Sequence, residues 1–395
     1  MAKDHAPQFH QDHSDFPQID RQATLQADRL VELARLQPLT DGGLRTSELL
    51  SEALANAPHH HDARILLERL HQMFVPRWHF PMLADKVRNR AFAEAIAAKV
   101  GPGDIVLDIG CGAGLTAMLA ARAGARHVYT CEQQPLIARA AVRVIEENGL
   151  GDRITVIPKP SHELVVGVDL PAPADVVISE IVDTVLLGEG ALATLVHAMR
   201  RLARPDARAI PEQGRLMAQP VDSDKLLALW RPGQAEGFDL GAFHHFASVA
   251  QITPNDLSAV GLRPLGPATD LFHFDFIRPD MRPGRTTRDL ACSSAGTLHA
   301  VFVFFEMDLG PGISLTNDLS SDGHWGRTAF LLDRPICAAP GDLLRLTAQH
   351  DTSQLSLSVQ GFASCTGDPD LPFLWMSHAA SSCPPRPDCR AVLTA

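Results

Sequence analysis

The spacing of apolar residues divides the chain into regions of different structure. Through residues 21–75 apolar positions recur every three to four residues, and the turn signals TDGG and ANAPHHHD interrupt them. This spacing places the apolar side chains on one face of a helix. The region is therefore predicted to form three short helices, in ADRLVELARL, TSELLSEAL and DARILLERLHQMF.

Residues 76–213 alternate between helical and strand-like segments. The helical segments are AFAEAIAAKV, LTAMLAARAG and LIARAAVRVIEENG, and the strand-like ones are IVLDIG, HVYTCE, ITVIP and ADVVISEIV. Strands that alternate with helices are typical of a parallel sheet with crossover connections. The pattern predicts an α/β class with a Rossmann-like domain in this region.

A different pattern begins near residue 214 and continues to residue 365. Short β-type segments with many turns follow one another, among them HAVFVFFEMDL, RTAFLLD, LLRLTAQHD and LSLSVQGF. They predict an antiparallel, β-barrel-like domain, interrupted at about 223–262 by an irregular, helical segment. Residues 1–20 are polar and predicted to be a disordered tail, and residues 366–395 form a Pro-rich C-terminal tail.

Composition narrows the function. The net charge of -11 argues against a general nucleic-acid binder and is compatible with a basic substrate. No run of about 18 apolar residues and no apolar leader is present, which favours a cytoplasmic protein without a membrane span. The 7 cysteines form no disulfide framework. Three adjacent histidines, His59, His60 and His61, cannot face one ion together, so no metal site is predicted.

The segment VLDIGCGAGLTAMLAARAGARHVYTCE carries the main ligand-binding motif. A strand ends at Asp108, a loop follows with Gly110 and Gly112, and after a helix a second strand delivers Glu132. An acidic residue at that second strand end is placed to accept both hydroxyls of a ribose. The G-x-G-x-G spacing with a preceding Asp resembles class I methyltransferases, which implies S-adenosyl-L-methionine as cofactor.

The segment VVISEIVDTVLLGEGAL holds Glu180 and Glu189 in an otherwise mostly apolar stretch. Ionised carboxylates are costly to bury unless a cation compensates them. A guanidinium presents a planar fork of donors that two carboxylates can clamp. The pair therefore predicts a site for a cation, and Asp183 between them is interpreted as a structural hydrogen-bond acceptor.

Two further motifs complete a family resemblance. PRWHFPMLADKVRNRAF contains His79, Met82, Asp85 and Arg88, and GHWGRTAFLLDRP follows far downstream. With the glycine loop and the paired glutamates, these motifs resemble the protein arginine methyltransferases across residues 76–365. The branch containing the seventh and ninth human members is most similar; its members carry two tandem modules, and this chain has room for one.

The resemblance implies roles for individual residues in cofactor binding. Arg88 would pair with the cofactor carboxylate with help from His79, and Glu132 would take the ribose hydroxyls. The family usually has Glu or Thr where this chain has His162, which departs from the pattern. The cofactor set implied is His79, Met82, Arg88, Asp108, Gly110, Gly112, Glu132, Ser161, His162 and Glu180.

On the acceptor side, the resemblance implies that Glu180 and Glu189 hold the substrate guanidinium. His324 would pair with Asp85 to close the site, and Trp325 would form a wall of the arginine pocket. The catalytic set implied is thus Glu180, Glu189, His324 and Asp85, with Glu180, Glu189 and Trp325 binding substrate. Gly323 replaces the family's usual Thr before the His-Trp pair.

The expected activity is S-adenosylmethionine-dependent methylation of arginine, with a protein, a peptide or a small guanidino compound such as free arginine as acceptor. The segment LWRPGQAEGFDLGAF resembles the family's dimerisation arm and implies a homodimer. A catalytically silent scaffold that works through the weakly tetratricopeptide-like N-terminal helices is the alternative from another class. A methyltransferase for oxygen or carbon would leave the paired glutamates without a purpose. Ile181 and Val182 after the first glutamate favour mono- or symmetric methylation.

Overall fold

A computed structural model describes residues 21–364 and 375–376 of the chain. It divides into two units, residues 1–76 and 77–395. The predicted tail at 1–20, and the predicted tail at 366–395 apart from the short strand β18 (Trp375–Met376), lie outside the described residues. The finer domain boundaries drawn from the sequence stay predictions.

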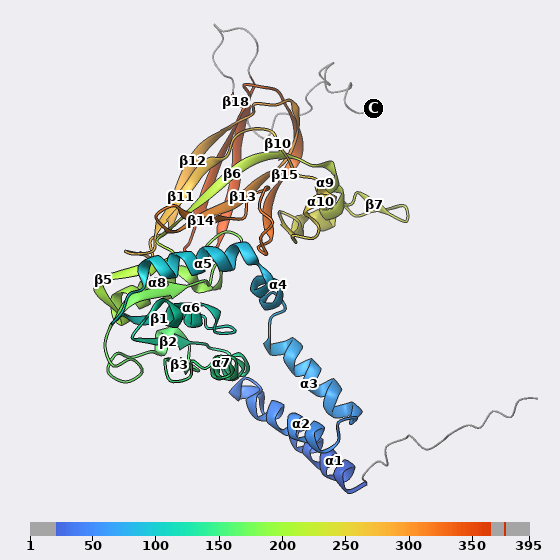
Figure 1. The fold of residues 1–395 in the computed structure, drawn as a ribbon. Coiled ribbons are helices and arrows are strands. Elements are labelled where there is room, and N and C mark those ends of the chain that lie inside the picture. Colours follow the sequence, from blue (N-terminus) through green and yellow to red (C-terminus); the bar gives the residue numbers. More distant parts are fainter. Residues whose placement is uncertain (1–20, 365–374, 377–395) are drawn as a thin grey trace, which may run out of the picture. The chain divides into compact units, whose positions relative to one another are not determined.

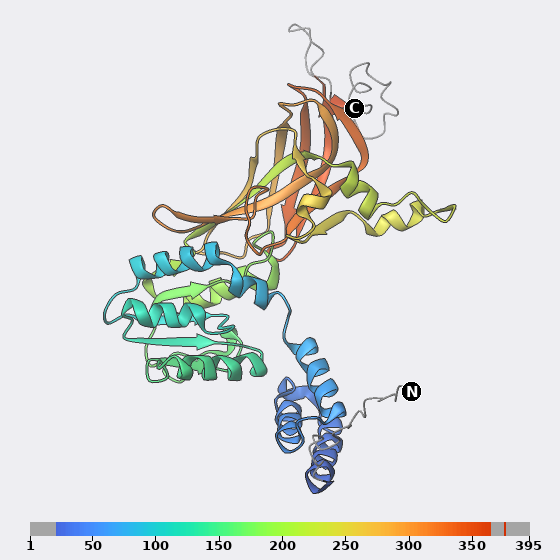
Figure 2. The same ribbon diagram turned by 45° about the vertical axis from the view of Figure 1, so that its right-hand side comes forward.

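The first unit is a small group of helices. α1 (Arg21–Arg35), α2 (Leu44–Asn56) and α3 (His61–Phe74) follow one another, so the prediction of three helices is confirmed. Their apolar faces share one cluster that includes Val31 and Leu50. Figure 2 shows α1, α2 and α3 in blue.

The second unit begins with a parallel five-stranded sheet in the order β3-β2-β1-β4-β5. The order reverses between β1 and β4, which is where α/β sheets usually bind ligands, at the carboxyl ends of the strands. The segments named in the sequence form β1 (Ile105–Ile109), β2 (His127–Cys131), β3 (Ile154–Ile157) and β4 (Ala174–Ser179), with α5 (Lys86–Lys99), α6 (Leu115–Ala123) and α7 (Pro135–Glu147) (Figure 1). Strand β5 (Ala203–Ile210) and helices α4 (His79–Ala84) and α8 (Ala191–His197) also belong to this part and were not named from the sequence.

Antiparallel sheets follow, and the predicted fold class is confirmed. A seven-stranded sheet has β13 at its centre between β6 and β15, and a second sheet runs in the order β12-β16-β17-β18. The bounds are β6 (Gln213–Asp222), β10 (Arg263–Pro264), β11 (Thr269–Asp275), β12 (Gly284–Ala291), β13 (Gly296–Gly310), β14 (Ile313–Thr316), β15 (Arg327–Ala338), β16 (Leu343–His350) and β17 (Leu355–Ala363).

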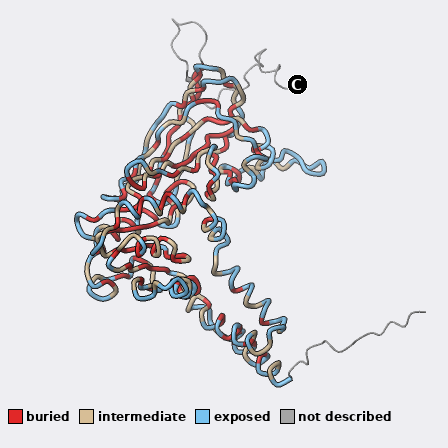
Figure 3. The backbone as a smooth tube through the Cα atoms, in the orientation of Figure 1, coloured by how far each residue is buried: buried red, intermediate tan, exposed pale blue. Residues whose placement is uncertain are grey.

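One core cluster joins the parallel and antiparallel sheets of the second unit. It runs from Phe92 on α5 and Val106 on β1 to Leu216 on β6 and Phe305 on β13. Buried positions accordingly continue along the strands of both parts (Figure 3). The two parts of this unit therefore share one packed core, so a substitution in one part can disturb the packing of the other.

The region 223–262 differs in part from the expectation of a helical, irregular segment. It holds α9 (Asp224–Trp230), the hairpin of β7 (Gln234–Ala235) and β8 (Phe238–Asp239), the 3-10 turn η5 (Gly241–Phe246) and α10 (Leu257–Val260). However, β9 (Val249–Ile252) pairs with β15 as an edge of the seven-stranded sheet. Four residues are too few to show alternation in the sequence, although Ala250 and Ile252 are buried on one side.

Membrane insertion by a helix finds no support in the structure: over residues 21–364, no helix is both long and apolar enough for a span.

Candidate active site

The glycine loop lies directly after β1 and leads into α6. Gly110 has a φ of +82°, in the left-handed region that side chains with a Cβ rarely adopt. A Cβ added there would also lie 2.8 Å from Cγ2 of Ile181, so the loop and the segment after β4 approach closely. Only glycine satisfies both conditions, which explains the motif at its first position.

Two acidic side chains meet at the carboxyl ends of neighbouring strands. Asp108 on β1 is buried, and its Oδ2 accepts a 2.7 Å hydrogen bond from Thr130 Oγ1 on β2. Glu132 follows β2, and its two oxygens accept from the backbone N–H of Gly112 at 3.2 Å and of Gln134 at 2.8 Å. Burial raises the pKa of Asp108 to about 6, although hydrogen bonds from threonine hydroxyls oppose the shift.

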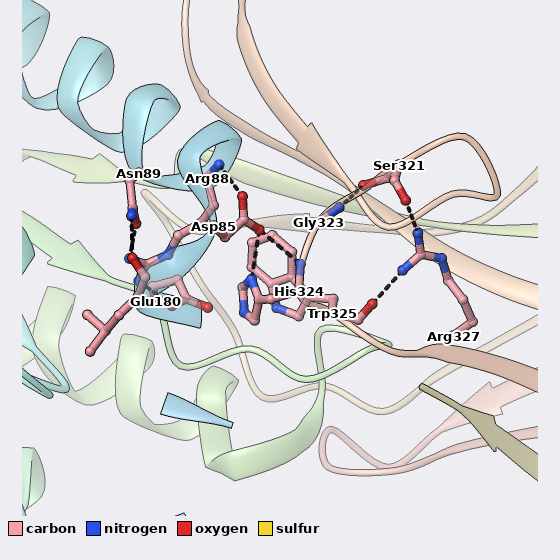
Figure 4. Close-up of polar contacts among 10 residues, drawn as sticks. Asp85, Arg88, Asn89, Glu180, Ser321, Gly323, His324, Trp325 and Arg327 are labelled. Atoms are coloured by element: carbon pink, nitrogen blue, oxygen red, sulfur yellow. Dashed lines mark hydrogen bonds and ion pairs between the residues drawn. The ribbon is translucent and has the colours of Figure 1, made fainter. Parts of the chain in front are cut away.

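A buried ion pair joins α5 to the end of β4. Arg88 Nη2 lies 2.5 Å from Glu180 Oε2, and both side chains are about 95% buried, with exposures of 5% and 6% (Figure 4). Nη1 of Arg88 donates to Asn89 Oδ1 at 2.9 Å. Burial raises the pKa of Glu180 to about 7, and the charge of Arg88 opposes this shift. The charges of Glu189 and Asp85 raise it further, which shows that these carboxylates lie near Glu180.

The residues here fit the cofactor implied by the sequence. Nε of Arg88 is buried and has no hydrogen-bond partner among the described residues. A buried donor of this kind is costly to leave unsatisfied, and a ligand carboxylate would satisfy it. Glu132 retains lone pairs for two further donors, as a ribose diol would supply. An anionic end and a diol thus find complementary groups on the two sides of the glycine loop.

The remaining residues proposed for the cofactor differ in how far they are buried. Met82 on α4 and Ser161 are buried, whereas His162 is exposed. The ring of His79 lies close to the glycine loop, because a Cβ at Gly112 would be 3.9 Å from its Cδ2. Among the residues proposed for the cofactor, His162 is the one that departs from the family pattern, and its side chain is exposed.

The loop between the two glutamates has an unusual backbone. Leu186 and Glu189 have φ values of +63° and +58°, which cost non-glycine residues free energy. Oδ1 of Asp183 accepts from the N–H groups of Val185 at 3.0 Å and Leu187 at 3.1 Å, as expected of a structural acceptor. Burial, reinforced by the charge of Asp183, raises the pKa of Glu189, and nearby His79 opposes the rise.

Asp85 connects two segments that are 239 residues apart. Its Oδ1 accepts from the N–H of Arg88 at 2.9 Å and so caps α5, while its Oδ2 accepts from the N–H of His324 at 2.9 Å and lies 3.0 Å from His324 Nδ1. Burial lowers the pKa of His324, and Asp85 opposes this shift. At neutral pH, a neutral imidazole with its proton on Nδ1 satisfies the contact.

Trp325 follows His324 and is buried against the β-domain. Its ring packs edge-on against Phe305, with centroids 5.2 Å apart, and lies 4.1 Å from the His324 ring. A Cβ at Gly323 would lie 3.2 Å from Asp85 Oδ2, which is tighter than usual contact distances. The glycine that replaces the family's threonine therefore leaves room for the Asp85 carboxylate.

Three buried polar residues of this region were not identified from the sequence. Thr130 binds Asp108, and Asn317 is fully buried with its side chain bonded to three backbone groups. Arg327 is also fully buried. Single residues of these types in loops or at strand ends are usually solvated or structural, so no pattern in the sequence distinguishes them.

The parallel sheet, the glycine loop and the acidic residue at the end of β2 define a class I S-adenosylmethionine-dependent methyltransferase. In agreement, residues 92–210 match the family model for ribosomal protein L11 methyltransferase. S-adenosyl-L-methionine is therefore the cofactor of this chain. No cluster of three or more metal-ligating side chains occurs in the described part of the chain.

Sequence relatives identify the family. An arginine N(omega)-methyltransferase of Streptomyces achromogenes subsp. streptozoticus is 41% identical over 286 residues, which cover 72% of this chain and 79% of the relative. Protein arginine N-methyltransferase 7 of Danio rerio is 30% identical over 73% of this chain and 47% of its own length. The chain thus spans about half the length of that relative. It belongs to the arginine N-methyltransferase family.

Solved structures agree with this fold. The Trypanosoma brucei PRMT1 enzyme-prozyme complex with AdoHcy matches with a TM-score of 0.63 at 21% identity, over 75% of this chain and 95% of that one. Arabidopsis thaliana protein arginine methyltransferase 10 matches over the same shares with a TM-score of 0.60, also at 21% identity. The chain is a member of a family of S-adenosylmethionine-dependent arginine methyltransferases.

Proposed function

We propose that this enzyme methylates a guanidino nitrogen of arginine that Glu180 and Glu189 clamp between them. The observation that carries the proposal is the pair itself. The glutamates are close enough for the charge of Glu189 to raise the pKa of Glu180. The side chain of Glu180 is buried, whereas Glu189 is exposed at the end of a loop held by Asp183 and is therefore accessible to an acceptor. Arg88 compensates one of the two carboxylate charges, and an incoming guanidinium supplies the second positive charge with a matching fork of donors.

The surrounding residues contribute to methyl transfer by holding the guanidinium in place and shaping its pocket. The cofactor, when bound, supplies an electrophilic methyl group on a sulfonium. Glu180 and Glu189 hold the cation and draw its positive charge away from the attacking nitrogen. Accurate placement of the reacting nitrogen supplies much of the acceleration in such a displacement. Asp85 and His324 hold the loop of Trp325, whose ring is proposed as a wall that excludes water from the acceptor.

Two acceptors are proposed: arginine within a polypeptide, and free arginine. The names of the relatives support both. The relative at 41% identity is named as a methyltransferase of arginine, whereas the relatives near 30% are named for protein arginine. The first relative is also covered over more of its length. Ile181 and Val182 remain the basis for proposing mono- or symmetric methylation.

A homodimer is part of the proposal. Three aromatic side chains of the segment from β8 to η5 are more than 70% exposed: Phe238, Phe243 and Phe246. The β7–β8 hairpin projects from the β-domain in Figure 1, where a second copy could cover these rings.

A cytoplasmic location stays a prediction from composition. The silent-scaffold alternative would not require the paired glutamates.

The test is mass spectrometry of reactions with isotopically labelled S-adenosylmethionine. Free arginine, an arginine-rich peptide and the same peptide with lysine for arginine are offered in parallel. Label on arginine, in either form, with none on the lysine peptide supports the proposal and identifies the acceptor class. Normal binding of S-adenosylhomocysteine without transfer to any guanidine contradicts it and favours the scaffold.

A further inference from the structure

Arg327, the first residue of β15, is a fully buried cation that binds a loop of its own chain. Its Nε donates to the carbonyl of Asp318 at 2.9 Å. Nη1 donates to the carbonyl of Trp325 and Nη2 to the carbonyl of Ser321 (Figure 4). Each of these acceptors belongs to the main chain. One side chain therefore bonds to the start, the middle and the end of the segment 318–325.

The chemistry of arginine explains why this position holds it. Burial lowers the pKa of Arg327, while the charges of Asp318 and Asp322 oppose the shift. A buried charge is retained at a cost, and multiple hydrogen bonds are what compensates it. A guanidinium offers five N–H donors in a rigid plane, whereas a lysine ammonium is a point charge on a flexible stem. Only the guanidinium matches three carbonyls that are fixed in different directions.

The loop that Arg327 binds carries two residues of the acceptor side. His324 contacts Asp85 through both its N–H and its ring, and Asp85 in turn caps α5 at Arg88. Arg88 then pairs with Glu180. A continuous series of contacts thus runs from the Arg327 guanidinium to the first glutamate of the proposed clamp. Figure 4 shows the members of this series together.

A second buried side chain ties the same loop to the glutamate loop. Nδ2 of Asn317 donates to the carbonyls of Thr184 and Gly326, each at 3.1 Å, and its Oδ1 accepts from the N–H of Phe305 at 2.7 Å. Thr184 lies between Glu180 and Glu189 in the sequence. Asn317 and Arg327 therefore fix the two ends of the segment that holds His324 and Trp325, and Asn317 sets its place against the glutamates.

We propose that Arg327 is a positioning residue for the acceptor site: its fork on the carbonyls of Asp318, Ser321 and Trp325 holds the loop in the one conformation that presents Trp325 and His324. The inference rests on the proposed function, because it concerns the pocket in which the guanidinium is methylated. Arg327 itself touches neither the cofactor residues nor the paired glutamates in any contact described above. Its removal should therefore impair use of the acceptor and spare binding of the cofactor.

The test compares Arg327→Lys and Arg327→Gln with the control Arg345→Lys in the full chain. Arg345 lies on β16 and also forms a fork, with both oxygens of Asp289 at 2.7 Å, but it is partly exposed and in another sheet. Three quantities are measured for each variant. They are the Kd of S-adenosylhomocysteine by calorimetry, kcat and KM for arginine, and hydrogen exchange of a peptide covering 318–326.

We expect Arg327→Lys and Arg327→Gln to lower kcat/KM for the acceptor at least 30-fold, with a rise in KM as well as a fall in kcat. The Kd of S-adenosylhomocysteine should stay within threefold, and exchange should accelerate in 318–326 rather than throughout the chain. Arg345→Lys should match the wild type within twofold in all three quantities.

Several results would overturn the inference. Acceptor kinetics within threefold of wild type in both variants would show that the fork does not position the pocket. Loss of cofactor binding in both variants, or faster exchange spread over the whole chain, would assign Arg327 to folding alone. If the wild type methylates no guanidine, the proposed function fails, and cofactor binding with loop exchange then decides separately whether Arg327 holds the loop.

Discussion

The cofactor region and the acceptor region of this enzyme are assembled in different ways. Around the cofactor, the deciding contacts join residues close in sequence: Thr130 to Asp108 across 22 positions and Gly112 to Glu132 across 20. Around the acceptor, Asp85 binds His324 across 239 positions, and Arg88, which is also proposed to bind the cofactor carboxylate, binds Glu180 across 92. The contacts around the glycine loop lie within one strand-helix-strand unit, β1-α6-β2, whereas the acceptor region exists only when the parallel sheet and the seven-stranded antiparallel sheet have both formed.

The long-range contacts cost more chain entropy, but they position the acceptor side independently of the cofactor side. Closing longer loops costs more entropy, although the cost rises only slowly with length. In return, the acceptor face is set by contacts that do not pass through the glycine loop. Variants should therefore separate into those that weaken cofactor binding and those that weaken use of the acceptor, and the following predictions test that separation.

The largest effect is expected for Glu189→Gln. The amide keeps the shape but removes one charge from the proposed guanidinium clamp, and kcat should fall by about 10³-fold, the scale of losing a preorganised electrostatic contact. Steady-state kinetics measures use of the acceptor, and calorimetry with S-adenosylhomocysteine measures cofactor binding. The Kd of S-adenosylhomocysteine should change less than threefold. Glu147→Gln, an exposed change on α7, is the control. Full activity in Glu189→Gln would refute the clamp.

Glu132→Gln should have the opposite selectivity. The variant loses the charge that we propose accepts hydrogen bonds from the ribose hydroxyls, and such bonds contribute about 1.5–3 kcal/mol, which corresponds to a rise of about 10- to 100-fold in cofactor Kd. At saturating cofactor, kcat and the acceptor KM should stay near wild type. Glu146→Gln, an exposed change on α7, serves as control. A rise in the acceptor KM as large as the rise in cofactor Kd would contradict the separation of the two regions.

Acidification should also distinguish the regions. The guanidinium stays protonated throughout, so the change comes from the carboxylates: Glu180, with its pKa raised to about 7, becomes neutral as the pH falls and no longer attracts the cation. Acceptor kcat/KM should therefore fall about tenfold per pH unit below 7. Asp108, with a pKa of about 6, keeps its charge until lower pH. A pH profile of acceptor kcat/KM that is flat between 6 and 8 would contradict this assignment.

The smallest effect is expected for Thr184→Val. It removes a 2.6 Å hydrogen bond between the hydroxyls of Thr184 and Thr328, and the free energy of unfolding should fall by about 1 kcal/mol. Thr287→Val removes a similar bond, from Thr287 to Thr347 at 3.1 Å, in the other sheet. Urea denaturation should show similar losses in both variants, while only Thr184→Val raises the acceptor KM, by about threefold. Equal kinetics in the two variants would argue against coupling through Thr184.

The same contrast explains what the sequence could and could not predict. The glycine loop and Glu132 follow a local spacing, so their position at the ends of β1 and β2 could be expected from periodicity and loop residues. The paired glutamates could be noticed as two carboxylates in a mostly apolar stretch, whereas their role toward arginine and the His-Trp pair came from family resemblance. Asn317 and Arg327 carry no local pattern, because their partners are main-chain carbonyls whose directions depend on how distant strands pack.

The backbone at Glu189 has a consequence for protein engineering. With a φ of +58°, this position favours glycine or asparagine on conformational grounds, and either would relieve strain of about 1–3 kcal/mol. A redesign that ranks substitutions by folding stability alone would therefore select against the glutamate and return a more robust protein without its acceptor clamp. Thermal screening of variant libraries at residue 189 should accordingly reward the changes that an activity screen discards.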